Sequence, residues 1–178
     1  MRMFEREREL QLLNELKEAE IANVITRGLN PDVKMKDSGI PWIGIIPEHW
    51  EIRRLSQVSY EHFVSNKNIH HQNLLSLSYG RIIRKDINTT EGLLPASFDT
   101  YQVVEEGNIV LRLTDLQNDQ KSLRVGLVKE EGIVTSAYIC LGVLNDSIIP
   151  SYLYNTLHSY DIKKLFYSMG GGLRQNLN

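Results

Sequence analysis

Residues 125–143 read VGLVKEEGIVTSAYICLGV, and this stretch decides the class of fold that we predict. Two apolar runs, at residues 125–129 and 133–143, flank the charged break Glu131-Gly132, which is typical of strands joined by a turn. Similar apolar runs, and similar turn signals, occur at residues 74–79 and 108–114, and at Gly80, Glu91-Gly92 and Glu106-Gly107. The sequence therefore predicts a mostly antiparallel sheet.

A predicted helix lies on each side of this sheet in the sequence. Residues 4–27 carry apolar side chains at helical spacing, and Gly28 with Pro31 marks the end of the helix. Pro150 suits the first turn of a second helix, which three glycines follow at residues 170–172. The apolar positions are Leu12, Leu13, Leu16, Ala19, Ile21 and Val24, then Leu153, Leu157, Tyr160 and Leu165. We predict an α+β fold: a leading amphipathic helix, then a twisted, mostly antiparallel sheet domain with a C-terminal helix packed on it.

The predicted organisation is a helix over residues 1–30, a polar linker over 31–39 and a domain over 40–178. Residues 40–50 are rich in proline, isoleucine and tryptophan, so we expect an extended, buried segment at the start of the domain. The apolar stripe of the helix needs a partner surface. That surface is either its own domain or a helix of another chain or of a second half.

Composition places the chain among folded proteins without a membrane span. Apolar residues make up 42% and charged residues 24%, and no run reaches the roughly 20 apolar residues that a span needs. The charged residues at 1–10 are unlike a signal peptide, so we expect a cytoplasmic protein. Cys140 is the only cysteine and lies in an apolar run, which favours a core residue. The net charge of −2 argues against DNA binding by bulk charge alone, yet a local basic face is compatible with it.

Four segments resemble a known family in the same order along the chain. The most specific is residues 35–50, MKDSGIPWIGIIPEHW. Together with residues 107–118, 132–138 and 172–177, it resembles the target-recognition domain of the specificity subunit of type I restriction-modification enzymes. Residues 21–29 resemble the end of the conserved helix that precedes such a domain.

The resemblance implies a DNA-reading subunit with no catalytic activity and no cofactor. In that family two such domains, spaced by two long antiparallel helices, each read half of a split site in double-stranded DNA. The subunit directs methyltransferase subunits and, through them, the restriction subunit. This sequence departs from the pattern, because it has one recognition domain and part of one helix. Three alternatives stay open: a truncated chain, a natural half-subunit or the remnant of a rearranged gene. Self-association through the helix is one way in which a second recognition half could be supplied.

Residues 112–124 are the first candidate for reading bases. They combine Arg, Asn, Gln and Asp, the side chains that match the hydrogen-bond patterns of base edges. A solvated hairpin loop would have a similar composition. Arg81, Arg84 and Lys85 suit phosphate contacts, or serve solubility. The candidate DNA-binding residues are Arg81, Arg84, Lys85, Arg112, Thr114, Asp115, Gln117, Asn118, Lys121, Arg124, Arg174 and Gln175.

Three other functions receive less support from the sequence. His70-His71 lacks a second cluster with ligand spacing, so we predict no metal site. A DNA-modifying enzyme would need a glycine-rich cofactor loop or a nuclease carboxylate–lysine motif, and we find neither, so we predict that the chain is not an enzyme. An assembly module that holds partner subunits without reading DNA is the main alternative.

Overall fold

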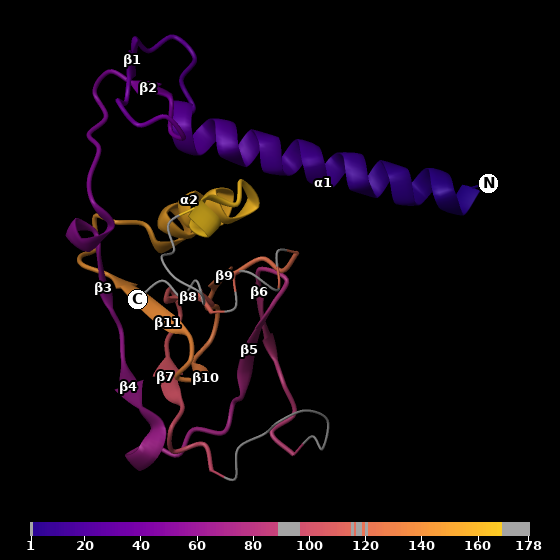
Figure 1. The fold of residues 1–178 in the computed structure, drawn as a ribbon, viewed down its shortest axis with the longest axis vertical. Coiled ribbons are helices and arrows are strands. Elements are labelled where there is room, and N and C mark those ends of the chain that lie inside the picture. Colours follow the sequence, from indigo (N-terminus) through magenta and orange to yellow (C-terminus); the bar gives the residue numbers. More distant parts are fainter. Residues whose placement is uncertain (1, 89–96, 115, 117–118, 120, 169–178) are drawn as a thin grey trace. The chain divides into compact units, whose positions relative to one another are not determined.

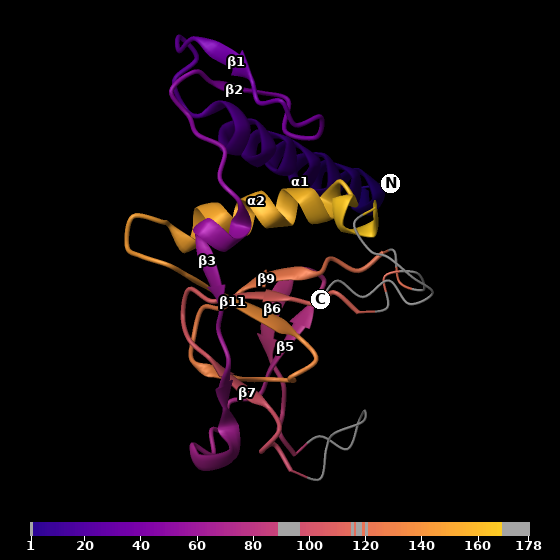
Figure 2. The ribbon, with the colours of Figure 1, turned by 60° about the vertical axis from the view of Figure 1, so that its left-hand side comes forward.

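The computed structural model describes residues 2–88, 97–114, 116, 119 and 121–168. The chain divides into two compact units, Met1–Arg54 and Leu55–Asn178. Figures 1 and 2 show the helices and strands of both units, coloured by their position in the sequence. The predicted α+β class is confirmed, with a leading helix, a mostly antiparallel sheet region and a C-terminal helix.

The first unit combines a long helix with a short strand pair. Helix α1 (Arg2–Arg27) ends at Gly28, which has a φ of +76° and whose N–H donates to the carbonyl of Val24 at 2.8 Å. Strands β1 (Met35–Asp37) and β2 (Ile45–Pro47) pair antiparallel. The predicted end of the helix at Gly28 is therefore confirmed, because glycine adopts the left-handed conformation without a steric penalty.

The segment 40–50 differs in part from the expected buried strap. Ile46 is buried and lies in the strand that packs on α1, but Ile45 is exposed and Trp42 is 44% exposed. For Ile45 and Ile46 the reason is the strand geometry, because neighbouring side chains of β2 point to opposite faces. The segment also belongs to the unit that contains α1, whereas our division of the sequence placed it with the sheet domain.

Within the first unit, α1 buries side chains only near its C-terminal end. Ile25 is buried, while the side chains of residues 4–20 are all exposed. Leu12, Leu13 and Leu16, which form the predicted apolar stripe, are therefore exposed. None of the described helices is long and apolar enough to cross a membrane.

The second unit contains two antiparallel sheets and a hairpin among its described residues. One sheet has the order β3 (Ser59–Glu61), β11 (Ile139–Val143), β8 (Ile109–Leu111) and β9 (Val125–Leu127). The other has the order β10 (Gly132–Val134), β7 (Gln102–Val104) and β4 (Val64–Ser65). Strands β5 (Leu75–Ser78) and β6 (Arg81–Arg84) form the hairpin. The single-turn helices are η1 (Leu55–Gln57), η2 (Asn66–Asn68) and η3 (Leu165–Ser168).

The expected strand at 133–143 is two strands. Strand β10 ends at Val134, a turn follows in which the N–H of Tyr138 donates to Thr135 at 3.1 Å, and β11 begins at Ile139. The two strands belong to different sheets, so the chain must change direction between them. The turn expected at Glu131-Gly132 is also displaced, because Gly132 pairs with Val104 inside β10. Glu91-Gly92 lies outside the described residues.

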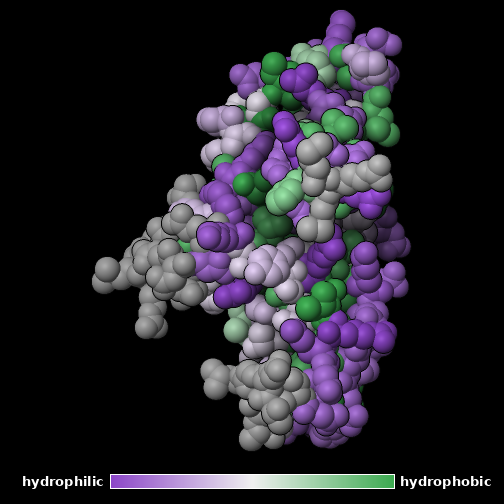
Figure 3. Space-filling model, turned by 90° about the vertical axis from the view of Figure 1, so that its right-hand side faces the viewer, coloured by the Kyte–Doolittle hydropathy of each residue, from purple (hydrophilic) through white to green (hydrophobic). Residues whose placement is uncertain are grey.

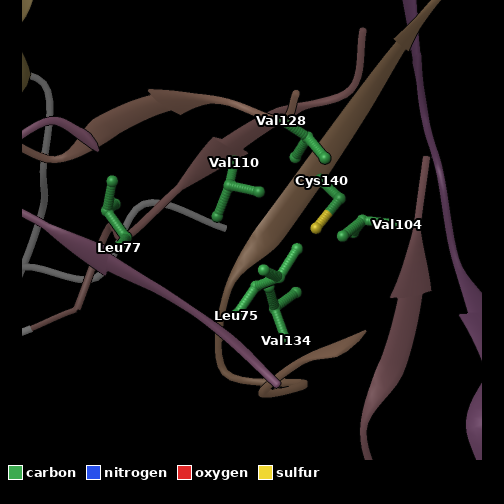
Figure 4. Close-up of a cluster of buried hydrophobic side chains, with 7 residues drawn as sticks. All are labelled: Leu75, Leu77, Val104, Val110, Val128, Val134 and Cys140. Atoms are coloured by element: carbon green, nitrogen blue, oxygen red, sulfur yellow. The ribbon is translucent and has the colours of Figure 1, made fainter. Parts of the chain in front are cut away.

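Strand β8 separates two hydrophobic cores. Val110 points into one core, whereas Ile109 and Leu111 point into the other, as the alternation of a strand requires. Figure 4 shows the first core, in which side chains converge from β5, β7, β8, β10 and β11, and Cys140 is one of them. Cys140 is buried in this core, which confirms the prediction of a core cysteine, and burial raises the pKa of its thiol to about 12.

The second core lies under helix α2 (Pro150–Ile162). Leu153 and Leu157 of α2 and Phe166 of η3 pack on Ile109, Leu111, Val125 and Leu141 of the four-stranded sheet. Figure 2 shows α2 lying across this sheet. The predicted C-terminal helix packed on the sheet is confirmed, and Pro150 stands at its start, where the missing N–H costs no hydrogen bond.

Candidate nucleic-acid interface

The candidate base-reading loop, residues 112–124, connects β8 to β9. The structure describes most of it, but Asp115, Gln117 and Asn118 lie outside the described residues. Arg112 and Thr114 are half-buried and Lys121 is exposed. Leu116 is completely buried and Leu113 packs against the core under α2, so apolar side chains of the loop lie in the interior. This arrangement differs from a hairpin loop that is solvated throughout.

Arg124 is the last residue of this loop and has no exposed surface. Its guanidinium group donates to the carbonyl oxygen of Thr114 at 2.7 Å and to that of Arg112 at 3.3 Å. It also donates to the carbonyl oxygen of Asp119, and its Nε atom donates to the hydroxyl of Tyr167 at 3.2 Å. The side chain of Arg124 therefore bonds from the interior to both limbs of the loop, which are residues 112–114 and residues 119–124.

Arg124 was among our candidate DNA contacts, and the structure places it elsewhere. The loop turns backbone carbonyls toward the interior, and buried carbonyls need donors. Arginine supplies five N–H donors in a fixed plane, which suits several carbonyls at once. In this conformation the guanidinium group has no exposed surface and serves the interior of the loop, and the contact of Arg124 with DNA stays a prediction.

Asp119 organises the second limb of the loop. Its carboxylate accepts hydrogen bonds from the N–H groups of Ser122 at 3.0 Å and Lys121 at 3.2 Å. Arg112 Nη1 and Arg124 Nη2 each lie 3.9 Å from Asp119 Oδ2. The hydrogen bonds from Ser122, ahead of the charge of Arg124, lower the pKa of the Asp119 carboxyl to about 2. Asp119 was not among the predicted site residues, although Asp119 followed by Lys121 and Ser122 has the spacing of an Asx turn.

Residues of helix α2 and of η3 form hydrogen bonds with the loop. The carboxylate of Asp161 accepts the backbone N–H of Arg124, and the hydroxyl of Tyr167 donates to the carbonyl oxygen of Asp119 at 3.1 Å. The guanidinium of Arg124 lies 5.7 Å from the centre of the Tyr167 ring, a cation–π distance. Neither residue was predicted, because only the fold brings them within reach of the loop.

Asp161 is buried with part of its hydrogen-bonding capacity unused. Its Oδ1 atom has no hydrogen-bond partner among the described residues. Burial raises the pKa of the Asp161 carboxyl, against the opposing effects of the Arg124 N–H and of the Lys164 charge.

The basic residues of the β5–β6 hairpin have unequal surroundings. Arg84 forms a two-point ion pair with Glu130, with Nε 2.7 Å from Oε1, so an acidic neighbour balances its charge. The side chains of Arg81 and Lys85 are exposed, and neither forms a hydrogen bond or ion pair with a described residue. In the face of the molecule that Figure 3 shows, hydrophilic side chains predominate, with hydrophobic ones scattered between them.

The hairpin and the loop meet on the same side of the second unit. A Cβ atom built on Gly80, at the tip of the hairpin, would lie 3.1 Å from the Cβ atom of Leu123, near the end of the loop. The structure therefore brings the segments 78–85 and 112–124 together. Arg174 and Gln175, the remaining candidates, lie outside the described residues.

The histidine pair at 70–71 has no metal-binding surroundings in the described part of the chain. There, no group of three or more His, Cys, Asp or Glu side chains is placed to hold a metal ion. His71 Nε2 instead lies 2.8 Å from a carboxylate oxygen of Glu131.

Comparisons of the sequence with protein-family models and with curated proteins find no match.

Proposed function

We propose that this chain is the recognition half of a type I restriction-modification specificity subunit and reads one half of a split DNA site. In this role it has no catalytic activity and directs methyltransferase subunits and, through them, a restriction subunit. Support comes from the resemblance of residues 35–50, 107–118, 132–138 and 172–177 to that family, in the family's order. The α+β fold with a C-terminal helix is compatible with the proposal.

The observation that carries the proposal is the internal support of the loop 112–124. Arg124 donates to the carbonyl groups of Thr114 and Asp119, and Tyr167 donates to that of Asp119, so the backbone at these positions is held from the interior. A fixed backbone is what direct readout needs, because hydrogen bonds to base edges tolerate little displacement. The loop sequence supplies Arg112, Gln117 and Asn118 for such bonds.

Phosphate contacts complete the proposed interface. Arg81, Lys85 and Lys121 are exposed cations near the loop or on the adjoining hairpin. Contacts of this kind fix the register of a protein on the duplex and add affinity that does not depend on sequence. Because the net charge is −2 and one half-site offers few contacts, we expect weak binding with a strong salt dependence.

A selection from randomised duplexes tests the proposal. The full chain, alone and with methyltransferase subunits, is mixed with a pool of labelled duplexes, and the bound fraction is sequenced and titrated over a range of salt concentrations. We expect enrichment of a short sequence and a gain in affinity when the subunits are added. Failure to bind any duplex at low salt, or binding without enrichment in the complete assembly, contradicts the proposal.

An assembly module that does not read DNA is the second candidate. The exposed leucines of α1 favour it, because a stripe of apolar side chains on a helix suits contact with another helix. The two roles also coexist in the favoured proposal, where the helix binds partner subunits or a second copy of the chain. A chain that binds methyltransferase subunits but adds no sequence preference to them is a pure assembly module.

The proposal also excludes catalysis by this chain. With S-adenosylmethionine, ATP and magnesium supplied, the purified chain should neither methylate nor cut DNA. The measurement is transfer of a labelled methyl group and cleavage of a plasmid. Turnover that disappears with a point substitution in this chain would show that it is an enzyme.

A further inference from the structure

The tip of the β5–β6 hairpin has an unusual residue in a strained position. Ser78 pairs with Arg81, so Tyr79 and Gly80 form a two-residue turn, and both have a positive φ, of 46° and 75°. Two positive φ angles define the type I′ turn that suits hairpins, and Asn, Asp and Gly are its preferred residues. Tyrosine is a poor choice there, because its Cβ atom crowds the backbone in the left-handed conformation.

Gly80 is explained by packing, because there is no room for a side chain. A Cβ atom at this position would lie 2.9 Å from His158 Cε1 and 3.1 Å from Leu123 Cβ. The hydroxyl of Tyr154 in α2 also donates to the carbonyl oxygen of Gly80 at 3.4 Å. The turn is therefore seated on α2 and on the end of the loop 112–124, which fixes the position of its neighbour Tyr79.

Packing, which explains Gly80, does not explain Tyr79. Its side chain is 75% exposed, so it adds little to the core. Its hydroxyl forms no hydrogen bond with any residue that the structure describes, and no ring contact involves it there. Tyr79 thus carries a large aromatic side chain on a strained backbone, and this side chain gains no compensating packing within the described structure.

We propose that Tyr79 contacts duplex DNA through its aromatic ring, packing on sugar and base surfaces beside the bases that the loop 112–124 reads. The inference rests on the proposed function. An aromatic ring offers a large, rigid contact area with few rotatable bonds, and apolar side chains inserted in a groove pack on base steps. The exposed guanidinium of Arg81, two residues away, is placed to bind an adjoining phosphate.

Replacing Tyr79 separates folding from binding because the two effects have opposite signs. Tyr79→Asn gives the Asn-Gly pair that type I′ turns favour, so the midpoint of thermal unfolding should rise by about 2–4 °C. Removal of the ring should lower the affinity for DNA by about tenfold. Tyr79→Phe keeps the ring and should bind as tightly as the original chain.

The binding measurement uses the full chain and a labelled pool of randomised duplexes at low salt. Phe63→Asn is the matched control, because Phe63 is another exposed aromatic residue and lies between β3 and β4. It should leave the affinity unchanged. Both variants are also compared by thermal unfolding.

Every outcome decides the proposal. If the original chain binds no duplex, the proposed function itself fails. If it binds, and Tyr79→Asn raises the unfolding midpoint but leaves affinity intact, the DNA contact is wrong while the proposed function stands. A loss of affinity for Tyr79→Phe equal to that of Tyr79→Asn would overturn a contact made by the ring. A lower midpoint for Tyr79→Asn would show that the ring stabilises the fold, which contradicts the premise of the proposal.

Discussion

The guanidinium group of Arg124 donates a hydrogen bond of 2.7 Å to the carbonyl oxygen of Thr114, although the two residues stand near opposite ends of the β8–β9 loop. The same group also reaches Arg112 and Asp119. One buried cation thereby joins described backbone positions from both parts of the loop through interior hydrogen bonds. This relationship leads to the first prediction.

Arg124→Met should destabilise the fold strongly. Methionine fills similar space but donates no hydrogen bonds, so carbonyl groups of Thr114 and Asp119 lose their buried donor. Removing one partner from a buried polar network costs about 3–5 kcal/mol in the free energy of unfolding. The measurement is unfolding in denaturant followed by circular dichroism. Arg112→Met is the control, since its half-exposed ion pair with Asp119 should contribute about 1 kcal/mol or less. Equal stability of the two variants would contradict an interior role for Arg124.

Asp119→Asn should reveal a stability contribution that depends on pH. The folded pKa of Asp119, about 2, lies below the ordinary value of 3.8. Its charge therefore stabilises the folded state above pH 3.8, and this contribution is lost as the pH falls toward 2. Asparagine still accepts the N–H of Ser122, so the difference between the proteins reports the charge. Thermal midpoints should differ at neutral pH and converge at acid pH, and a constant difference would contradict the assignment.

Asp161 should show the opposite sign. Burial raises its folded pKa above the ordinary value of 3.8, so its stabilising contribution is complete below that pH and falls as the pH rises through the folded pKa. Asp161→Asn removes this dependence and keeps an oxygen for the N–H of Arg124. Comparison of the unfolding free energies of the two proteins from acid to neutral pH measures it. A variant that loses relative stability as the pH rises would show that the sign is wrong.

Local patterns predicted the end of α1 and the start of α2, but they predicted neither the end of α2 at Ile162, ahead of the expected glycines at 170–172, nor the interior of the site. Gly28 and Pro150 mark their helix ends in the sequence, because the physical reason for each is local. Asp161 and Tyr167 carry no such signal, since Asp161 bonds to a residue 37 positions away and Tyr167 to residues 43 and 48 positions away. The burial of Arg124 was unpredictable for the same reason, because an arginine in a polar loop resembles a surface residue until the fold supplies its acceptors. Residues 133–143 form two strands, β10 and β11, because these strands belong to different sheets. A continuous apolar run does not show where the chain passes from one sheet to another.

Gly126→Ala tests how the hairpin docks on the sheet. A Cβ atom at Gly126 in β9 would lie 2.6 Å from Leu77 Cδ1 and 2.9 Å from Ile82 Cδ1, both from the β5–β6 hairpin. Overpacking of this kind costs about 1–3 kcal/mol in the free energy of unfolding. Leu77→Ala should cost less in the Gly126→Ala background than alone, because it makes room for the added methyl group. Strictly additive effects in denaturant unfolding would show that the hairpin does not rest on Gly126.

The last prediction separates base reading from phosphate binding in the proposed interface. Alanine at Arg112, or at Gln117 or Asn118 in the same loop, should cost about 1–3 kcal/mol on the selected site and change non-specific binding little. Alanine at Arg81 or Lys121 should instead weaken binding to all duplexes alike, because a phosphate contact is independent of sequence. Each of these two substitutions should lower the slope of log affinity against log salt concentration by about one. The assay titrates the complete assembly against the selected duplex and a scrambled one at several salt concentrations. If none of the three loop substitutions changes the ratio of the two affinities, the loop does not read bases, and the readout lies elsewhere in the domain.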